Sequence, residues 1–308
     1  MDGMVVCFQS LGKVKRRKLH KFVIMTSIPF ITVYSTLQEK ATFEFSNQYN
    51  LFVELGQHHI GLSVFDPVDN KLLDVEMINL NEDINSSFVQ SYLEYSGIDF
   101  KKFRNVHLIF NTKEFALIPS SLHNPLFHRD LVETIHGDML DLQFNADQLS
   151  HFEAVNVYGV QREINTVLNR FFPDAQRVHK NACIVKGISS QLDTLPSEFI
   201  KIFFSPSHMD VLVVKNGKLQ FLQKFYYETT DDAIFYILTL SEKFKLNRKE
   251  IGFFASGIID LDSLIIFELK KYFPAFEIEI SKENSITSHI ADIPAHYLTP
   301  LMISLQCV

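Results

Sequence analysis

The sequence predicts a mixed α/β protein of two similar lobes, and three observations lead to this fold class. The chain has 308 residues, about twice the length of a typical domain. Residues 51–110 and 199–254 can be laid over one another as the same series of elements. In each copy, short apolar runs typical of strands surround one segment with helical periodicity. Two lobes, each with its own core, therefore organise the chain.

The first copy contains three strands, a helix and a fourth strand. The strands are predicted at LFVEL, HIGLSVFD, KLLDVEMINL and VHLIF, and the helix at INSSFVQSYLEYSG. A turn at residues 66–70, rich in Asp and Asn, joins the second and third strands. The helix can end at Gly97, because glycine readily takes the left-handed conformation that follows a last helical turn.

The second copy repeats this order at nearly the same spacing. Its strands are predicted at FIKIFF, MDVLVV, KLQFLQKFYY and IGFFA, and its helix at DDAIFYILTLSEKF. Asn216-Gly217 predicts a tight hairpin between the second and third strands, and Thr230 is a candidate helix cap. A matching order in both halves indicates an internal duplication of one structural unit.

The remaining segments connect and complete the two copies. A helix is predicted over residues 159–172, and Pro173 stops it. A short strand near 175–178 and a helix near 181–189 lead into the second lobe. Another helix is predicted over 260–273, with Asp260 as its cap. The predicted lobes are residues 41–174 and 175–308.

Residues 1–40 are expected to lie outside the fold. The first 24 residues carry a net charge of +5, and residues 13–37 place a basic stretch before a mostly apolar one. This order is typical of a secretory signal or membrane anchor. The segment also fits an over-extended gene start, with Met25 as the initiator, or a basic interaction tail. The three alternatives stay open.

Charge and cysteine content exclude several classes of function. With a total of −7 and +5 in the first 24 residues, the rest of the chain carries −12, which disfavours nucleic-acid binding. Cys7, Cys183 and Cys307 lie far apart, so neither a disulfide framework nor a zinc site is predicted. His58 and His59 would point to opposite faces of a strand, so no metal site is predicted there either. A reducing, cytoplasmic location is the simplest expectation, with membrane association through residues 13–37 as the alternative.

Three antiparallel strands, a crossover helix and a fourth strand, present twice, resemble the duplicated RNase H-like core of the actin, hexokinase and Hsp70 superfamily. More narrowly, residues 45–308, including IADIPAHYLTPL near the end, resemble a Bacteroidales family of unknown function with an actin-like ATPase fold. The resemblance covers about 85% of the chain. It implies in each lobe a mixed sheet of three antiparallel strands plus parallel strands, with flanking helices, and a nucleotide site in the cleft between the lobes.

The resemblance also implies where nucleotide would bind. Glu54, Gly56 and Gln57 fall in the first hairpin, where the superfamily has Asp-x-Gly, and Ser256-Gly257 fall at its adenosine turn. These five residues are the candidate nucleotide-binding residues. Each also has a structural interpretation: Glu54 as a solvent-facing strand residue, and the glycines as turn formers.

The second hairpin, residues 202–210, departs from the pattern. Its acidic position is apolar, it has no glycine, and Pro206 has no N–H to offer a phosphate. Losing two or three charge-assisted hydrogen bonds, worth roughly 1.5–3 kcal/mol each, would weaken a micromolar site to millimolar. Half of the phosphate site is therefore expected to be absent.

No catalytic residues and no cofactor are predicted, and ATP with Mg²⁺ is kept as the alternative. The remaining acidic clusters are predicted to be solvated loops or caps; they are Asp141, Asp147, Asp231 and Asp232. The first hypothesis is a catalytically silent binding or scaffold module with a protein partner. The second is an ATPase or small-metabolite kinase with a divergent phosphate site. The third is a membrane-associated assembly protein.

Overall fold

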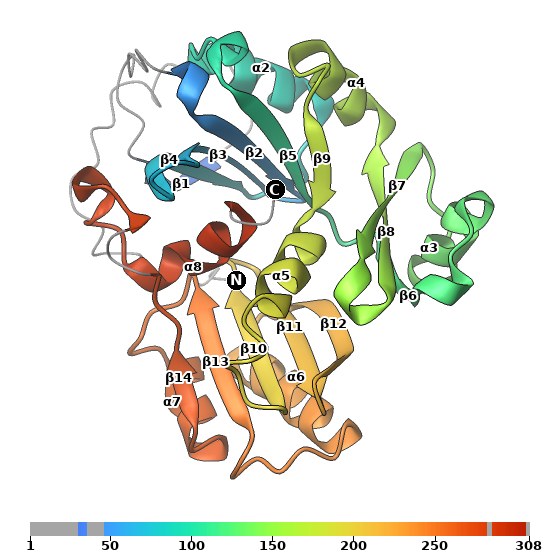
Figure 1. Ribbon diagram of the computed structural model, residues 1–308, viewed down its shortest axis with the longest axis vertical. Coiled ribbons are helices and arrows are strands. Elements are labelled where there is room, and N and C mark those ends of the chain that lie inside the picture. The colour runs from blue at the N-terminus through green and yellow to red at the C-terminus, as the bar shows by residue number, and fades with distance from the viewer. Residues whose placement is uncertain (1–29, 36–45, 282–284, 306–308) are drawn as a thin grey trace, which may run out of the picture.

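The first copy forms four strands of a six-stranded sheet (Figure 1). The computed structural model describes residues 30–35, 46–281 and 285–305. The copy comprises β2 (Asn50–Gly56), β3 (His59–Asp66), β4 (Lys71–Leu80), α2 (Ser86–Ser96) and β5 (Asn105–Asn111). The sheet order is β1-β4-β3-β2-β5-β9, with β3 antiparallel and β5 parallel to the central strand β2.

The second copy builds a five-stranded sheet with the same core order. Its elements are β10 (Phe199–Phe204), β11 (His208–Lys215), β12 (Lys218–Tyr226), α6 (Thr230–Lys243), β13 (Gly252–Gly257), α7 (Leu264–Tyr272) and β14 (Phe276–Ile278). The order β12-β11-β10-β13 matches β4-β3-β2-β5, with the same strand directions. The predicted fold class is confirmed. That the shared order arose by duplication stays a prediction.

Backbone pairing gives a residue-by-residue correspondence between the copies. The β2–β3 hairpin closes at Leu55 opposite Ile60, and the β10–β11 hairpin closes at Phe204 opposite Met209. Each hairpin therefore has four residues beyond its last pair. On this register Glu54 corresponds to Phe203.

Local signals in the sequence explain several element ends. Asn216 and Gly217 both have positive φ, 52° and 68°, as the tight hairpin requires, and Gly97 ends α2 at φ 66°. The cap of α6 is Thr229, one residue before the predicted Thr230. Its hydroxyl accepts a hydrogen bond from the N–H of Asp232, whose carboxylate accepts one from the N–H of Thr229.

The first lobe also carries a small sheet that the sequence did not predict. It consists of β6 (Phe115–Pro119), β7 (Leu142–Leu149) and β8 (Ala154–Gln161) in the order β6-β8-β7, with α3 (His128–His136) packed on it. The following helix, α4 (Arg162–Phe171), begins later than predicted because residues 159–161 belong to β8.

The predicted boundaries differ from the structure in three places. Strand β1 (Phe30–Ser35) pairs with β4, although residues 1–40 were expected outside the fold. Strand β9 (Gln176–His179) pairs with β5 in the first sheet rather than opening the second lobe. Helix α7 starts after Ser263, and Asp260 does not cap it; its carboxylate accepts a hydrogen bond of 2.9 Å from the Tyr297 hydroxyl.

Helices α2 and α4 cover the outer face of the first sheet, and α6 and α7 cover that of the second. Two helices, α5 (Lys180–Ser189) and α8 (Ala295–Leu305), lie between the sheets (Figure 1). The inner faces of both sheets share one hydrophobic core with these two helices; it includes Phe52, Leu72, Cys183, Phe199, Phe203, Leu298 and Met302. Within the described ranges, no helix is long and apolar enough to cross a membrane.

Candidate functional site

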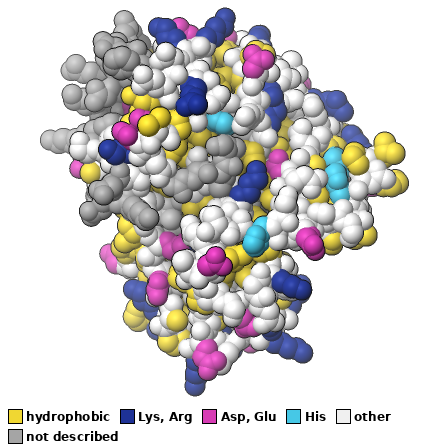
Figure 2. Space-filling view, viewed as in Figure 1, with side chains coloured by type: hydrophobic (Ala, Val, Ile, Leu, Met, Phe, Trp, Pro, Cys, Tyr) yellow, Lys and Arg dark blue, Asp and Glu magenta, His cyan; other side chains and the backbone are white. Residues whose placement is uncertain are grey.

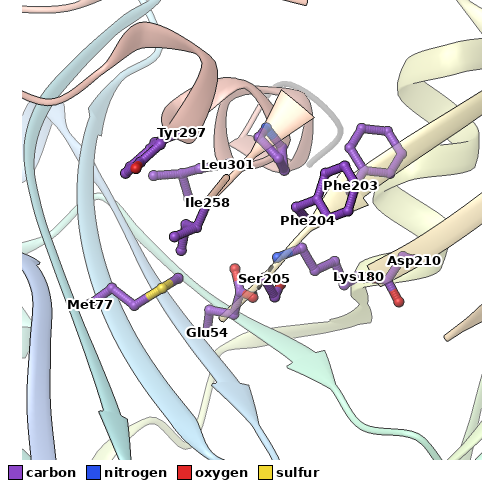
Figure 3. A pocket seen from close by; sticks show the side chains of 11 residues that line it. Glu54, Met77, Lys180, Phe203, Phe204, Ser205, Asp210, Ile258, Tyr297 and Leu301 are labelled. Carbon is purple, nitrogen blue, oxygen red and sulfur yellow. Dashed lines mark hydrogen bonds and ion pairs between the residues drawn. The ribbon is translucent and has the colours of Figure 1, made fainter. Parts of the chain in front are cut away.

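Glu54 lies at the centre of a buried polar network between the lobes, and Figure 3 shows it beside Lys180. Its side chain projects from β2 and the residue is only 4% exposed. Its Oε1 accepts hydrogen bonds from Lys180 Nζ at 2.6 Å and from Asn111 Nδ2 at 3.0 Å, and lies 3.0 Å from His59 Nε2. The expectation that Glu54 faces solvent is therefore wrong.

The environment keeps Glu54 charged. Burial alone would raise its pKa, but the Lys180 ammonium and the hydrogen bond to His59 hold that pKa well below its usual range. Burial lowers the pKa of His59 even though Glu54 opposes the shift. Lys180, the first residue of α5, thus forms an ion pair with Glu54 of the first hairpin.

The second lobe contributes Lys224, His208 and Asp210 to the network. Lys224 Nζ donates to the side-chain oxygen of Asn111, lies 3.0 Å from His208 Nε2 and lies 3.5 Å from Asp210 Oδ1. Burial lowers the pKa of Lys224 against the pull of Asp210, and burial together with Lys224 lowers that of His208. The Asn111 amide, which also binds Glu54, joins the halves of the network across the cleft.

A small cavity lies next to the network where the two lobes meet. Its volume is about 20 Å³, measured to the centres of water-sized spheres, and it lies beside Glu54 and Lys180 (Figure 3). That volume holds about one water molecule. The lining residues are Glu54, Met77, Lys180, Phe203, Phe204, Ser205, Asp210, Ile258, Tyr297, Pro300 and Leu301, the last three from α8.

The candidate residues of the first hairpin have structural partners. A Cβ at Gly56 would lie 2.0 Å from the His59 ring, so glycine makes room for that ring beside Glu54. Gln57 donates to Asp83 Oδ1 at 2.9 Å and accepts from the Tyr226 hydroxyl at 2.8 Å, which links the two lobes.

Ser256 and Gly257 lie at the end of β13, in the other sheet. Ser256 is fully buried. Gly257 has φ +99°, and a Cβ there would lie 2.2 Å from the carbonyl oxygen of Phe204. Of the five candidate residues, only Glu54 lines the cavity.

The sequence analysis missed most of the network: Asn111, Lys180, His208, Asp210 and Lys224. One signal could have found Asp210, because this residue interrupts the apolar run of β11. A charge inside an apolar strand is rarely buried without a partner. Lys180 and Asn111 carry no such local signal, since the strand end and helix start that hold them are polar.

Asp147 also differs from its prediction as a solvated residue. It lies on β7, and its carboxylate accepts a hydrogen bond of 2.8 Å from the backbone N–H of His179. Burial raises the pKa of Asp147 to about 6 and lowers that of His179 to about 3. Among the described residues, no group of three or more His, Cys, Asp or Glu side chains could hold a metal ion.

The two facing sheets, with helices between them and a site at their hairpins, define a two-lobed actin-like ATPase fold. A protein of unknown function with this fold from Bacteroides thetaiotaomicron VPI-5482 matches with a TM-score of 0.68 and 17% identity, over 83% of this chain and 98% of that one. The chain belongs to DUF3822, a family of proteins of unknown function, whose model matches residues 38–276.

A second similar structure is the PilM-PilN type IV pilus biogenesis complex, with a TM-score of 0.54 and 10% identity over 84% of this chain and 98% of that one. At these identities the two structures show the fold alone. None of the curated proteins matches the sequence. The expected restriction to Bacteroidales stays a prediction.

Proposed function

We propose that the chain is a catalytically silent, actin-like binding module that serves a protein partner. The observation that carries this proposal is the ion pair that already engages Glu54. Lys180 Nζ lies 2.6 Å from Oε1 of Glu54, the acidic residue of the first hairpin. The neighbouring cavity has room for about one water molecule. A nucleotide pocket is typically a cleft of several hundred Å³.

The charges in the network are balanced without a ligand. Two carboxylates, Glu54 and Asp210, face two ammonium groups, Lys180 and Lys224. A Mg²⁺ ion would have to displace a lysine from a carboxylate, and a phosphate would meet the carboxylates themselves. Either step would remove a buried ion pair, which is costly when one partner is left behind.

The second hairpin adds an independent obstacle to phosphate binding. Pro206 offers no N–H, and the N–H of Ser205 donates to the carbonyl oxygen of His208 at 2.8 Å. The α8 residues Tyr297, Pro300 and Leu301 also line the cavity and narrow it with apolar side chains. The shared core also opposes opening, because the lobes would have to part along its apolar surface.

Calorimetric titration of the full chain with Mg-ATP and with Mg-ADP tests the proposal. We expect no binding at micromolar concentrations, in a sample whose cooperative thermal unfolding shows that it is folded. Micromolar binding would overturn catalytic silence and favour an ATPase or a small-metabolite kinase. In that case Glu54→Gln should abolish binding, whereas Asp83→Asn, outside the cavity, should not.

A further inference from the structure

The end of the molecule formed by α3 exposes an unusual amount of apolar surface. We call it the α3 surface and define it by five side chains that are 52–87% exposed: Leu122, Leu126, Phe127, Ile135 and Leu140. In Figure 2, hydrophobic side chains gather at the end of the molecule where Figure 1 places α3. Exposed apolar side chains that cluster in this way mark interaction sites more often than scattered ones do.

These residues are not needed for the local core. The inward side of α3 already packs Val132 against Ala116, Val155 and Val157 of the small sheet. Phe127 ends the turn before α3 and Ile135 lies in the last turn of the helix, and both side chains are exposed. Helix α4 of the same lobe exposes only polar or charged side chains, whereas α3 also exposes Ile135. The other four apolar residues of the α3 surface lie in the turns before and after this helix.

The α3 surface is also acidic. Between residues 120 and 141, Asp130, Glu133, Asp138 and Asp141 stand against a single Arg129, a net charge of −3. Arg129 donates to Glu133 Oε1 at 2.7 Å and to the carbonyl oxygen of Met139 at 2.9 Å, so its charge is engaged within the lobe. A complementary partner must combine apolar side chains with cations.

We propose that the α3 surface docks an amphipathic helix of a partner protein, with an apolar face and Lys or Arg along its edges. The proposal rests on the binding-module function above and names the surface and the chemistry of its partner. An amphipathic helix presents apolar side chains on one face and can carry cations along its edges, which is the combination that the α3 surface requires. A symmetric contact with a second copy would bring together two α3 surfaces, each with a net charge of −3, which would repel one another. An anionic lipid surface would be repelled in the same way.

Two synthetic peptides of about 18 residues, long enough to form a helix, test the proposal. Both carry the same leucine face; one has Lys and Arg along the edges and the other has Glu. In fluorescence anisotropy titrations with the full chain, we expect the cationic peptide to bind about tenfold more tightly or better. This affinity should fall with added salt because screening weakens the charge complementarity.

Variants locate the binding. Leu126→Ser/Phe127→Ser should weaken the cationic peptide about tenfold, and Asp138→Asn/Asp141→Asn should weaken it severalfold and flatten its salt dependence. These side chains are exposed, so the fold should tolerate the changes. The matched control is Leu264→Ser/Phe267→Ser on α7, which removes two apolar side chains that are each 59% exposed. It should leave the affinity unchanged.

Three results would overturn the inference: equal affinity for the two peptides, equal loss in the α7 control, or no loss in the Leu126/Phe127 variant. Sedimentation that shows a dimer in the wild type and a monomer in that variant would also overturn it, in favour of self-association. The nucleotide titration is a separate readout. Micromolar ATP binding with intact peptide binding would refute catalytic silence alone, whereas loss of peptide specificity without ATP binding would refute only this docking site.

Discussion

The two central strands, β2 and β10, have the same place in their sheets but carry their buried charges differently. On the register of the two hairpins, Phe52 corresponds to Lys201 and Glu54 to Phe203. Each strand therefore directs one aromatic ring and one charged side chain toward the interior between the lobes. In β2 the aromatic residue comes first along the chain, and in β10 the charged residue comes first. Even the neighbours correspond, because Phe52 lies opposite His107 on β5 and Lys201 opposite Phe254 on β13.

The chemistry at these equivalent positions differs, although the backbone pairing is the same. Phe52 stacks on His107 with ring centroids 4.7 Å apart, whereas Lys201 lies 5.8 Å from the Phe254 ring and pairs with Glu279 at 2.7 Å. Lys201 is thus neutralised within its own lobe. Glu54 is held by α5 and, through Asn111, by the second lobe. At equivalent strands, Lys201 is paired within its own lobe, whereas Glu54 takes part in contacts that join the two lobes.

The largest expected effect on stability comes from removing the Glu54 carboxylate. Glu54→Ala leaves Lys180 buried without its carboxylate, so the free energy of unfolding should fall by about 3–5 kcal/mol. Urea denaturation at pH 7.5 measures the change. The double variant Glu54→Leu/Lys180→Met removes both charges and should recover most of the loss. A loss below about 1 kcal/mol for Glu54→Ala would show that the pair does not hold the lobes.

The next largest effect is expected at Gly257 and Gly56, where substitution by alanine should lower stability by different amounts. Gly257→Ala places a Cβ against the Phe204 backbone at a positive φ, and we expect a loss of about 2–4 kcal/mol. In Gly56→Ala the atoms nearest to the new Cβ belong to the His59 ring. This ring can swing away at the expense of its contact with Glu54, so a loss of about 1–2 kcal/mol is expected. Thermal and urea unfolding of both variants give the order. The reverse order would mean that the first hairpin is the more tightly constrained.

The sequence allowed the sheets to be predicted far better than the site. Strand order followed from short apolar runs and from turns such as Asn216-Gly217, which are local signals. The network depends on contacts between distant residues, such as Lys180 with Glu54 across 126 positions. Glu54 stands alone between apolar neighbours, which indicates a charge that needs a partner if it is buried, but nothing in its own segment shows that the partner is Lys180.

The two stacked hairpin histidines offer the finest comparison. His59 and His208 occupy equivalent positions, with ring centroids 6.4 Å apart. Burial lowers the pKa of both, but His59 has the Glu54 carboxylate to favour its protonated form, whereas Lys224 lowers the pKa of His208 further. In the unfolded chain each histidine takes up a proton near pH 6.5. Below that pH the unfolded state binds more protons than the folded state, so stability falls as the pH falls.

Replacing each histidine by glutamine should therefore change the acid sensitivity unequally. Between pH 6.5 and 5, His208→Gln should reduce the loss of stability by about 2 kcal/mol, since each pKa unit corresponds to about 1.4 kcal/mol, and His59→Gln should reduce it by less. Urea denaturation at both pH values, on both variants and the wild type, measures the difference. His179 and Asp147 also titrate unusually, but they are present in all three proteins and cancel in the comparison. Equal slopes for the two variants would show that Glu54 does not distinguish the hairpins, and that Lys180 alone compensates its charge.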